Sequence, residues 1–198
     1  MNDLLLSILI PTVLDRAAQF HKLKQFIYRQ LVDNELTDVV EILFLQDNKE
    51  ITIGEKRTKL YRMAHGHYAW QIDDDDWIHP NAIPLIIDQI KNDDCDCVGF
   101  KELCIYDGKR VESSNFSIKY GGWADNVDGF NHVRTPFFKT PIRTRLCLQA
   151  PIPPIRFGED HEFSKLIYPY LRKENYIDEF IYHYRHNSSP HNERYGIS

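Results

Sequence analysis

The sequence predicts an α/β fold in which a mainly parallel sheet lies between two layers of helices. Apolar runs at residues 4–10, 39–47 and 67–72 have the hydrophobicity of buried strands, and a segment with helical periodicity follows each of them. Strands and helices that alternate in this way form parallel sheets with right-handed crossovers. At 198 residues, the chain is expected to form one domain that spans residues 1–198.

The first strand, over residues 4–10, is expected to end at Pro11. Asp15 is placed to cap the next helix, whose apolar side chains recur at helical spacing: Phe20, Leu23, Ile27 and Leu31. The run at 39–47 predicts a second buried strand, which ends at Asp47.

The second helix has clear start and stop signals. Thr52 and Glu55 have the spacing of a capping box, which predicts a helix over residues 53–64. Gly66 is expected to end it in the left-handed conformation.

A third strand over residues 67–72 precedes a helix that begins after Pro80. Residues 98–114 have the pattern of two strands around a turn at Asp107 and Gly108. Residues 115–157 contain many glycines and prolines, so loops, short strands and a short helix near 144–148 are expected there. A helix from about Glu159 and a strand over residues 176–187 complete the predicted elements.

The composition excludes several classes of protein. A net charge of −5 and a pI near 6.0 predict no globally basic surface for nucleic acid, although a local basic groove stays open. The four cysteines fit neither a disulfide framework nor a structural zinc site, so buried, reduced thiols are expected. The N-terminal run LLLSILIP is too short to span a bilayer and lacks the features of a signal peptide, which makes the cytoplasm the expected location.

Four aspartates, residues 73–76, directly follow the third predicted strand. Ligands of parallel α/β sheets bind outside the carboxyl ends of the strands, where adjacent carboxylates repel unless they are exposed or bind a cation. Carboxylates with positions left for phosphate oxygens suit Mg²⁺ or Mn²⁺. The alternative is a solvated acidic start of the following helix.

A second acidic pair, Glu159 and Asp160, stands in the stretch GEDHEF. It can simply cap a helix, since the helix dipole favours anions there. A carboxylate at this position can also remove the proton of an attacking hydroxyl, as a transferase requires.

Several stretches, taken in order, resemble the motifs of the family 2 glycosyltransferases with a GT-A fold. They are SILIPT, VEILFLQDN, GEKRTKLYRMAHG, QIDDDDWIHP, GEDHEF and YHYRHNSS. The resemblance covers nearly the whole chain. It implies a nucleotide-sugar-binding half (1–99), an acceptor and catalytic-base half (100–198), and a sugar donor that is a nucleoside diphosphate sugar, with UDP favoured.

The resemblance also implies roles for individual residues in binding the nucleotide sugar. On this basis, the donor is expected to contact Pro11, Thr12, Asp15, Arg16, Asp47, Lys56, Arg57, Asp73, Asp74 and Arg185. Surface charge is the alternative for the basic pair, Lys56 and Arg57. Of the four aspartates, Asp74 is the one whose side chain is most readily expected to point into solvent instead.

The metal and the catalytic base follow from the same resemblance. Mn²⁺ or Mg²⁺ is expected to be bound by Asp75, with Asp76 and His186, although His183 and His191 remain alternatives. Asp160 matches the base that deprotonates the acceptor hydroxyl, and attack from the face opposite the phosphate inverts the anomeric centre.

The acceptor is the least determined partner. Tyr120, Trp123 and Glu159 are candidate contacts, although the two aromatic residues can equally anchor their loop. A glycan or lipid-linked saccharide is the favoured acceptor, ahead of a protein or a hydroxylated DNA base. The acidic chain disfavours DNA, but a local basic stretch could meet phosphate: His132, Arg134, Lys139, Arg143 and Arg145.

Two other functions use the same residues. A metal-dependent phosphodiesterase also clusters carboxylates, but it would hydrolyse a nucleotide without any acceptor. A noncatalytic nucleotide-sugar-binding module would need Asp160 only as a helix cap.

Overall fold

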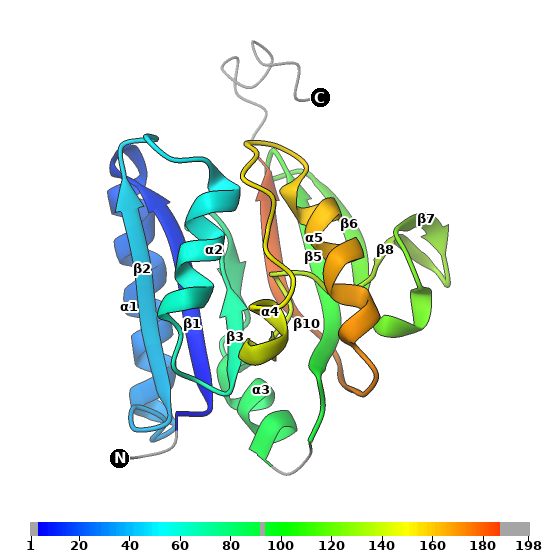
Figure 1. The fold of residues 1–198 in the computed structure, drawn as a ribbon, viewed down its shortest axis with the longest axis horizontal. Helices are drawn as coiled ribbons and strands as arrows, with labels where there is room; N and C mark the ends of the chain where they lie inside the picture. The colour runs from blue at the N-terminus through cyan, green and yellow to red at the C-terminus, as the bar shows by residue number, and fades with distance from the viewer. Residues whose placement is uncertain (1–3, 92–93, 187–198) are drawn as a thin grey trace.

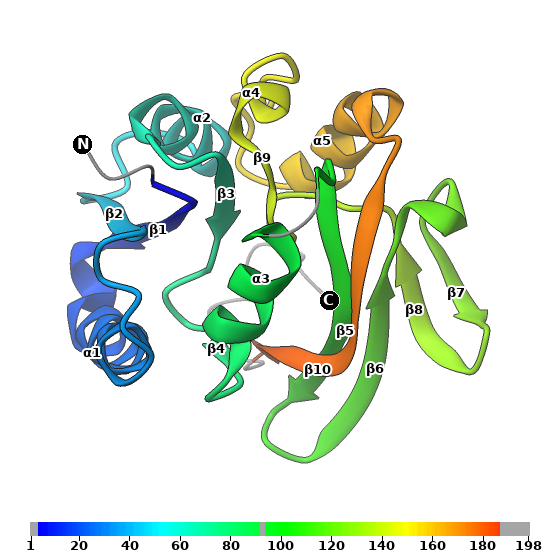
Figure 2. The same cartoon turned by 90° about the horizontal axis from the view of Figure 1, so that it is seen from below.

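The computed structural model describes residues 4–91 and 94–186, in which ten strands form one mixed sheet with helices on both faces (Figure 1). The strands are β1 (Leu6–Val13), β2 (Val40–Asp47), β3 (Tyr68–Gln71), β4 (Trp77–Ile78), β5 (Cys97–Tyr106), β6 (Arg110–Phe116), β7 (Ala124–Val127), β8 (Phe130–Arg134), β9 (Ile142–Arg143) and β10 (Glu174–His186). The α-helices are α1 (Ala17–Asp33), α2 (Ile53–Met63), α3 (Ala82–Lys91), α4 (Thr144–Cys147) and α5 (Glu159–Ile167). Helices α1 and α3 cover one face of the sheet, and α2, α4 and α5 cover the other (Figure 2).

The three-layer arrangement with a mainly parallel sheet is confirmed. The main path of the sheet is β2-β1-β3-β9-β5-β6-β8-β7, and β10 pairs with β5 and β4. Strand β1 is parallel to both β2 and β3, and β10 is parallel to β5. The short β9 is antiparallel to β3 and β5, so it joins the two halves of the sheet.

The first two strands differ from the prediction. β1 continues through Pro11 to Val13, which pairs with Asp47. Its register with β3 ends at Leu9, so only β2 runs beside Pro11, and a missing N–H is tolerated where one side of a strand is open. β2 is the edge strand rather than a strand buried on both sides, and its Phe44 is 40% exposed.

The first helix begins differently from the prediction. Asp15 lies in a short 3₁₀ helix, Leu14–Arg16, and α1 starts after it without a side-chain cap. Asp15 instead forms an ion pair with Lys49 at 2.7 Å. The apolar stripe of α1 is buried as predicted.

The capping box of α2 is confirmed. Thr52 Oγ1 accepts a hydrogen bond from the Glu55 N–H at 3.2 Å, and Glu55 Oε2 accepts one from the Thr52 N–H at 2.9 Å. The expectation for Gly66 is wrong, since it does not adopt the left-handed conformation. An added Cβ there would lie 2.6 Å from the Ser7 backbone nitrogen, so the lack of a side chain permits close packing against β1.

The later elements follow the sequence pattern. The turn between β5 and β6 places Asp107 and Gly108 at positive φ, 52° and 65°, and α4 is the short helix expected near residue 144. All four cysteines are buried and form no disulfide. No helix in the described part of the chain is long and apolar enough to cross a membrane.

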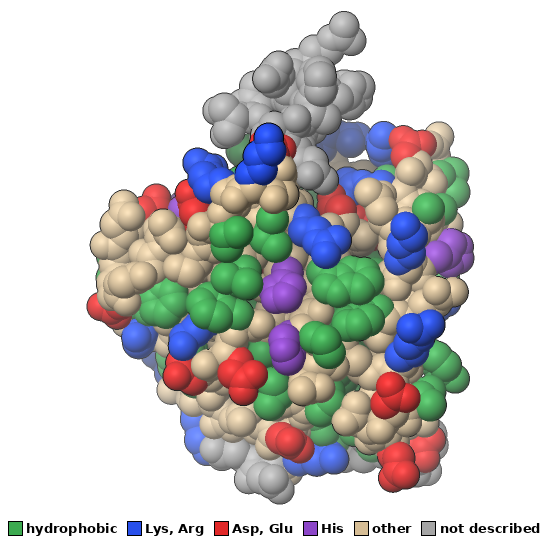
Figure 3. All heavy atoms as spheres, turned by 180° about the vertical axis from the view of Figure 1, so that it is seen from behind, with side chains coloured by type: hydrophobic (Ala, Val, Ile, Leu, Met, Phe, Trp, Pro, Cys, Tyr) green, Lys and Arg blue, Asp and Glu red, His purple; other side chains and the backbone are tan. Residues whose placement is uncertain are grey.

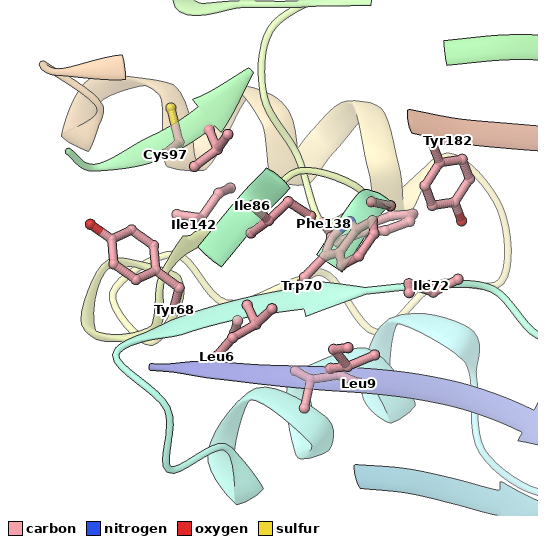
Figure 4. Close-up of a cluster of buried hydrophobic side chains, with 14 of the residues drawn as sticks. Leu6, Leu9, Tyr68, Trp70, Ile72, Ile86, Cys97, Phe138, Ile142 and Tyr182 are labelled. Carbon is pink, nitrogen blue, oxygen red and sulfur yellow. The ribbon is translucent and has the colours of Figure 1, made fainter. Parts of the chain in front are cut away.

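The core lies between the sheet and its helices (Figure 4). Trp70 of β3 and Tyr182 of β10 are fully buried there, with ring centroids 6.3 Å apart. Both strands run toward residues 73–76, so packing in the core fixes the position of the two strands that flank these aspartates.

Candidate active site

A cleft of about 690 Å³ opens at the carboxyl ends of β1 and β3. Its walls come from the end of β1, the first turn of α2, the segment after β3, the inner residues of β5, β6 and β8, and the start of α5. Of the residues singled out in the sequence, those that line it are Pro11, Thr12, Arg16, Lys56, Arg57, Asp73, Asp74, Asp75, Trp123, His132, Arg134, Lys139, Glu159 and Asp160. The fold thus brings together residues up to 149 positions apart.

Residues 73–76, here called the aspartate loop, form a tight turn closed by a hydrogen bond from the Asp76 N–H to the Asp73 carbonyl at 3.1 Å. Arg16 bridges two of its carboxylates, at 2.6 Å from Asp74 and 2.7 Å from Asp75. Burial raises the pKa of both carboxyls, and Arg16 opposes that rise. The expectation that Asp74 faces solvent is wrong, because only 3% of it is exposed.

Arg57 connects the aspartate loop to α5. Its guanidinium lies 2.8 Å from Asp73 and 3.3 Å from Glu159, and it also donates to Gln71 at 3.2 Å. The group is buried and stacks 3.5 Å above the Phe138 ring centroid. Arg57 is therefore a buried structural cation of the cleft and not an exposed surface charge.

Lys56 is buried next to Arg57. Its ammonium donates to the Thr12 carbonyl at 2.6 Å and forms an ion pair with Asp47. The second oxygen of Asp47 accepts a hydrogen bond from the Ile51 N–H at 3.1 Å. Asp47 does not line the cleft, and it is connected to the cleft wall through Lys56.

Asp76 points away from the cleft. Its carboxylate accepts hydrogen bonds from Tyr182 Oη at 2.8 Å and from the Arg185 N–H at 2.9 Å, and Lys139 Nζ lies 3.5 Å away. Burial raises its pKa, which the neighbouring ammonium of Lys139 opposes.

The two acidic residues at the start of α5 have different surroundings. Glu159 is buried against Arg57, and burial raises its pKa while Arg57 lowers it. Asp160 is only partly buried and lines the cleft, with one oxygen accepting the His161 N–H at 2.8 Å. Both residues line the cleft, and Asp160 is the more accessible of the two.

The residues near the C-terminal end of β10 lie beside the cleft. The exposed Arg185 side chain stacks on Trp77, with 5.4 Å between the guanidinium and the ring centroid. His186 contacts Tyr106 and Tyr184. Neither Arg185 nor His186 lines the cleft, and His191 falls outside the described residues.

The aromatic loop before β7 packs onto the domain. The Trp123 ring lies 5.4 Å from Phe137 and 5.0 Å from His161, and the Arg134 guanidinium lies 4.9 Å from it. Its buried Nε1 has no hydrogen-bond partner among the described residues. Tyr120 is half-buried outside the cleft lining, so of the two only Trp123 reaches the cleft wall.

The stretch that the sequence suggested as locally basic is largely neutralised. His132 contacts Glu112 and Asp125 at 2.8 and 2.9 Å, and Arg134 contacts Asp125 at 3.0 Å. The other paired cations are Lys139, with Glu102, and Arg143, with Asp94. On the face behind, basic and acidic side chains are interspersed (Figure 3).

Sequence reasoning missed several cleft residues. Lys139 is predicted only as part of a local basic stretch, but it is buried against Glu102. Phe157, which the sequence does not single out, lines the cleft and is 73% exposed. A lysine that follows Phe137 and Phe138 in an apolar segment was the available signal.

A comparison with protein families decides the class. The model of glycosyl transferase family 2 matches residues 27–147, more than half of the chain, and the match includes the aspartate loop. The chain belongs to glycosyl transferase family 2. Its fold is the GT-A fold expected from its motifs.

Solved structures agree with the family 2 fold. The structure of S. aureus TarS 1–349 has a TM-score of 0.61 at 17% identity, covering 92% of this chain and 60% of TarS 1–349. TarS 1–349 in complex with UDP-GlcNAc gives 0.63 at 14% identity, covering 96% and 61%, and the complex with UDP gives 0.60 at 15%, covering 98% and 63%. The chain thus spans about three fifths of those structures. No curated protein sequence matches it.

The carboxylates of the aspartate loop fit a divalent cation that takes part of its ligand shell from outside the protein. Asp75 lines the cleft, and one oxygen of Asp74, buried in the same wall, accepts no hydrogen bond from the described residues. Among the described residues, no three His, Cys, Asp or Glu side chains are arranged to hold a metal ion. Mg²⁺ and Mn²⁺ sites in nucleotide enzymes commonly use one or two carboxylates and complete their shell with phosphate and water.

Proposed function

We propose that the chain transfers a sugar from a nucleoside diphosphate sugar, with UDP favoured, to a hydroxyl of a saccharide acceptor, and that it inverts the anomeric centre. Membership of family 2 supports the transfer, and the UDP-GlcNAc and UDP complexes of TarS, which has the same fold, support the donor. The observation that carries the proposal is that Asp160 and the aspartate loop line one cleft.

Asp160 is the proposed general base. It stands in the first turn of α5, is accessible from the cleft and has no cation within ion-pair distance among the described residues. A carboxylate so placed can accept the proton of a hydroxyl as that oxygen attacks. Attack from the side opposite the diphosphate gives inversion.

The donor diphosphate is proposed to bind beside Arg16 and the aspartate loop. Pro11 and Thr12 form the wall next to Arg16, and the nucleoside is proposed to bind there. The ribose or sugar is proposed to bind beside the ion pair of Arg57 and Asp73. Guanidinium groups form directed, charge-assisted hydrogen bonds with phosphate oxygens.

The metal ligand is proposed to be Asp75, with Asp74 adjoining. Asp76 is fully hydrogen-bonded inside the protein and His186 lies outside the cleft lining, which disfavours both as ligands. Mn²⁺ or Mg²⁺ held at Asp75 would offset the charge that develops on the departing nucleoside diphosphate.

The acceptor is proposed to be an uncharged saccharide. Beyond Asp160 the cleft wall contains Trp123 and Phe137, and two of its cations, Arg134 and Lys139, are paired with Asp125 and Glu102. Aromatic walls with a few polar groups suit sugars. A phosphate-rich acceptor such as DNA would need unpaired cations instead.

The proposed function is tested with a panel of nucleotide sugars and Mn²⁺, read by thermal stabilisation and then by sugar transfer to saccharide acceptors. A ligand that binds only the folded chain raises Tm, so UDP-sugars should raise it more than GDP-sugars or ADP-sugars. Chelation should remove the shift. Stabilisation by no nucleotide sugar, or hydrolysis of the donor at the same rate with and without acceptors, would contradict the proposal.

A further inference from the structure

The aspartate loop has an internal anchor that the family resemblance does not explain. Asp73, Asp74 and Asp75 line the cleft, whereas Asp76 turns into the protein. Both Asp76 oxygens are bound by β10, one by Tyr182 Oη at 2.8 Å and one by the Arg185 N–H at 2.9 Å.

Tyr182 holds the loop at two points. Besides donating to Asp76, its hydroxyl oxygen accepts a hydrogen bond from the Asp73 N–H at 3.2 Å. One hydroxyl thus joins the first and last residues of the loop. Tyr182 itself is fixed, because it is fully buried between Phe100 and Trp70.

Lys139 supplies the buried positive charge behind Asp76. Its ammonium lies 3.0 Å from Glu102 and 3.5 Å from Asp76, over the Tyr184 ring at 4.1 Å. Its carbonyl accepts the Trp70 Nε1–H at 2.5 Å, which ties the lysine to β3, the strand that leads into the loop. A buried carboxylate is costly unless it is paired and hydrogen-bonded, so this cluster allows Asp76 to stay inside.

We propose that Tyr182 and Lys139 are positioning residues of the donor site, which act through Asp76 to hold the aspartate loop in the conformation that receives a nucleoside diphosphate. The inference rests on the proposed function for its ligand, but the state of the loop can be measured without one. Asp76 is then an anchor of the loop, and Asp73 to Asp75 are the residues it presents to the cleft.

The first test compares Tyr182→Phe with Tyr176→Phe. Both tyrosines belong to β10 and each donates a hydrogen bond at 2.8 Å, but Tyr176 donates to Asn115, away from the aspartate loop. Hydrogen–deuterium exchange of peptides covering residues 72–78 is followed in the ligand-free full chain. Tyr182→Phe should speed this exchange by roughly tenfold, because a hydrogen bond to a carboxylate and one from a loop amide are lost together. Equal exchange in the two variants would overturn the proposal.

The second test uses calorimetric titration with UDP and Mn²⁺. Tyr182→Phe should weaken binding by roughly tenfold, whereas Tyr176→Phe should bind like the wild type. A charge-balanced double variant, Lys139→Gln with Glu102→Gln, removes the ion pair without leaving Glu102 uncompensated, and it should also weaken binding and speed loop exchange. Unchanged exchange and unchanged UDP affinity in this variant would overturn the role of Lys139.

The outcomes separate the two proposals. If the wild type binds no nucleotide, the proposed function fails, while loop exchange still decides whether Tyr182 and Lys139 position the loop. If Tyr182→Phe melts far below Tyr176→Phe, the charge-balanced variant provides the decisive comparison. If the wild type binds UDP, and Tyr182→Phe and the double variant bind it equally well, the positioning role is rejected while the proposed function stands.

Discussion

The guanidinium of Arg57 lies 2.8 Å from the carboxylate of Asp73, and the same group reaches Glu159 at 3.3 Å. One buried cation of α2 therefore joins the loop proposed to bind the donor to the helix that carries the proposed base. Removing it would leave two largely buried carboxylates without a partner.

We expect Arg57→Ala to lower the free energy of unfolding by about 3–5 kcal/mol, the usual cost of breaking a buried ion pair from one side. Urea unfolding measures this change. Arg62→Ala is the matched control, because Arg62 is exposed on the same helix and its loss should change stability by no more than about 0.5 kcal/mol. Equal effects of the two substitutions would refute the structural role of Arg57.

Asp160→Asn should lower the rate of transfer by about 10²–10⁴-fold while donor affinity stays the same, because an amide cannot accept the acceptor proton. Steady-state transfer assays and donor titration measure the two quantities. Glu162→Gln on the same helix removes an exposed carboxylate that pairs with Lys165 at 2.5 Å, and it should leave transfer unaltered. A donor-binding module without catalysis would show no transfer in any of the three proteins.

Arg16 occupies the carboxylates to which the metal is proposed to bind. Arg16→Ala should therefore tighten Mn²⁺ binding in the absence of nucleotide, by roughly two- to fivefold, since a half-exposed ion pair is worth little. The same variant should bind UDP more weakly, because a guanidinium partner of the phosphates is lost. Calorimetry with Mn²⁺ alone gives the first quantity, with Arg29→Ala on the exposed face of α1 as the control. Weaker Mn²⁺ binding by the Arg16 variant would contradict competition for these carboxylates.

The layers of the fold were accessible from the sequence because hydrophobic periodicity and capping signals are local. The capping box of Thr52 and Glu55 and the turn at Asp107 and Gly108 depend only on neighbouring residues, and both formed as predicted. Strand neighbours are not local. The sequence of β2 could not show that it lies at the sheet edge, because an apolar run predicts a strand without naming its partners.

The candidate site, like the fold, combines features that the sequence predicts with contacts that it does not predict. The strand-end rule placed the aspartates at a ligand-binding edge, because carboxyl ends of parallel strands meet there. Asp160 stands in the first turn of a helix, so only the family resemblance linked it to the same cleft, which both line. The contact between Asp76 and Lys139 joins residues 63 positions apart. Charge type alone made Lys139 look like a surface cation, because burial of a lysine is decided by partners that only the fold supplies.

Glu41 should make stability depend on pH. Its carboxylate accepts hydrogen bonds from Ser7 Oγ at 2.6 Å and the His65 N–H at 2.7 Å, and these lower its pKa although burial opposes them. A lowered folded-state pKa means that the stabilisation is present above the unfolded value of about 4.3 and is lost as pH falls through the folded value. Glu41→Gln should therefore reduce stability by about 1 kcal/mol at pH 7, with a difference from the wild type that shrinks below about pH 4. Thermal melts across pH 3.5–7 measure it, and a difference that grows on acidification would show the opposite sign.

Alanine substitutions at Gly66 and Gly122 should change the free energy of unfolding in opposite directions. At Gly66 the new Cβ would meet the Ser7 backbone nitrogen at 2.6 Å and the Leu6 carbonyl carbon at 2.7 Å, and paired strand backbone cannot move aside cheaply. Gly66→Ala should therefore destabilise the fold by about 3 kcal/mol. At Gly122 no atom outside its immediate neighbours lies within 4 Å of the new Cβ and φ is not left-handed, so Gly122→Ala should stabilise by about 0.5 kcal/mol through the unfolded chain. Urea unfolding of the two variants tests how the segment after α2 packs against β1. If Gly66→Ala leaves the free energy of unfolding unchanged, this close approach is not required.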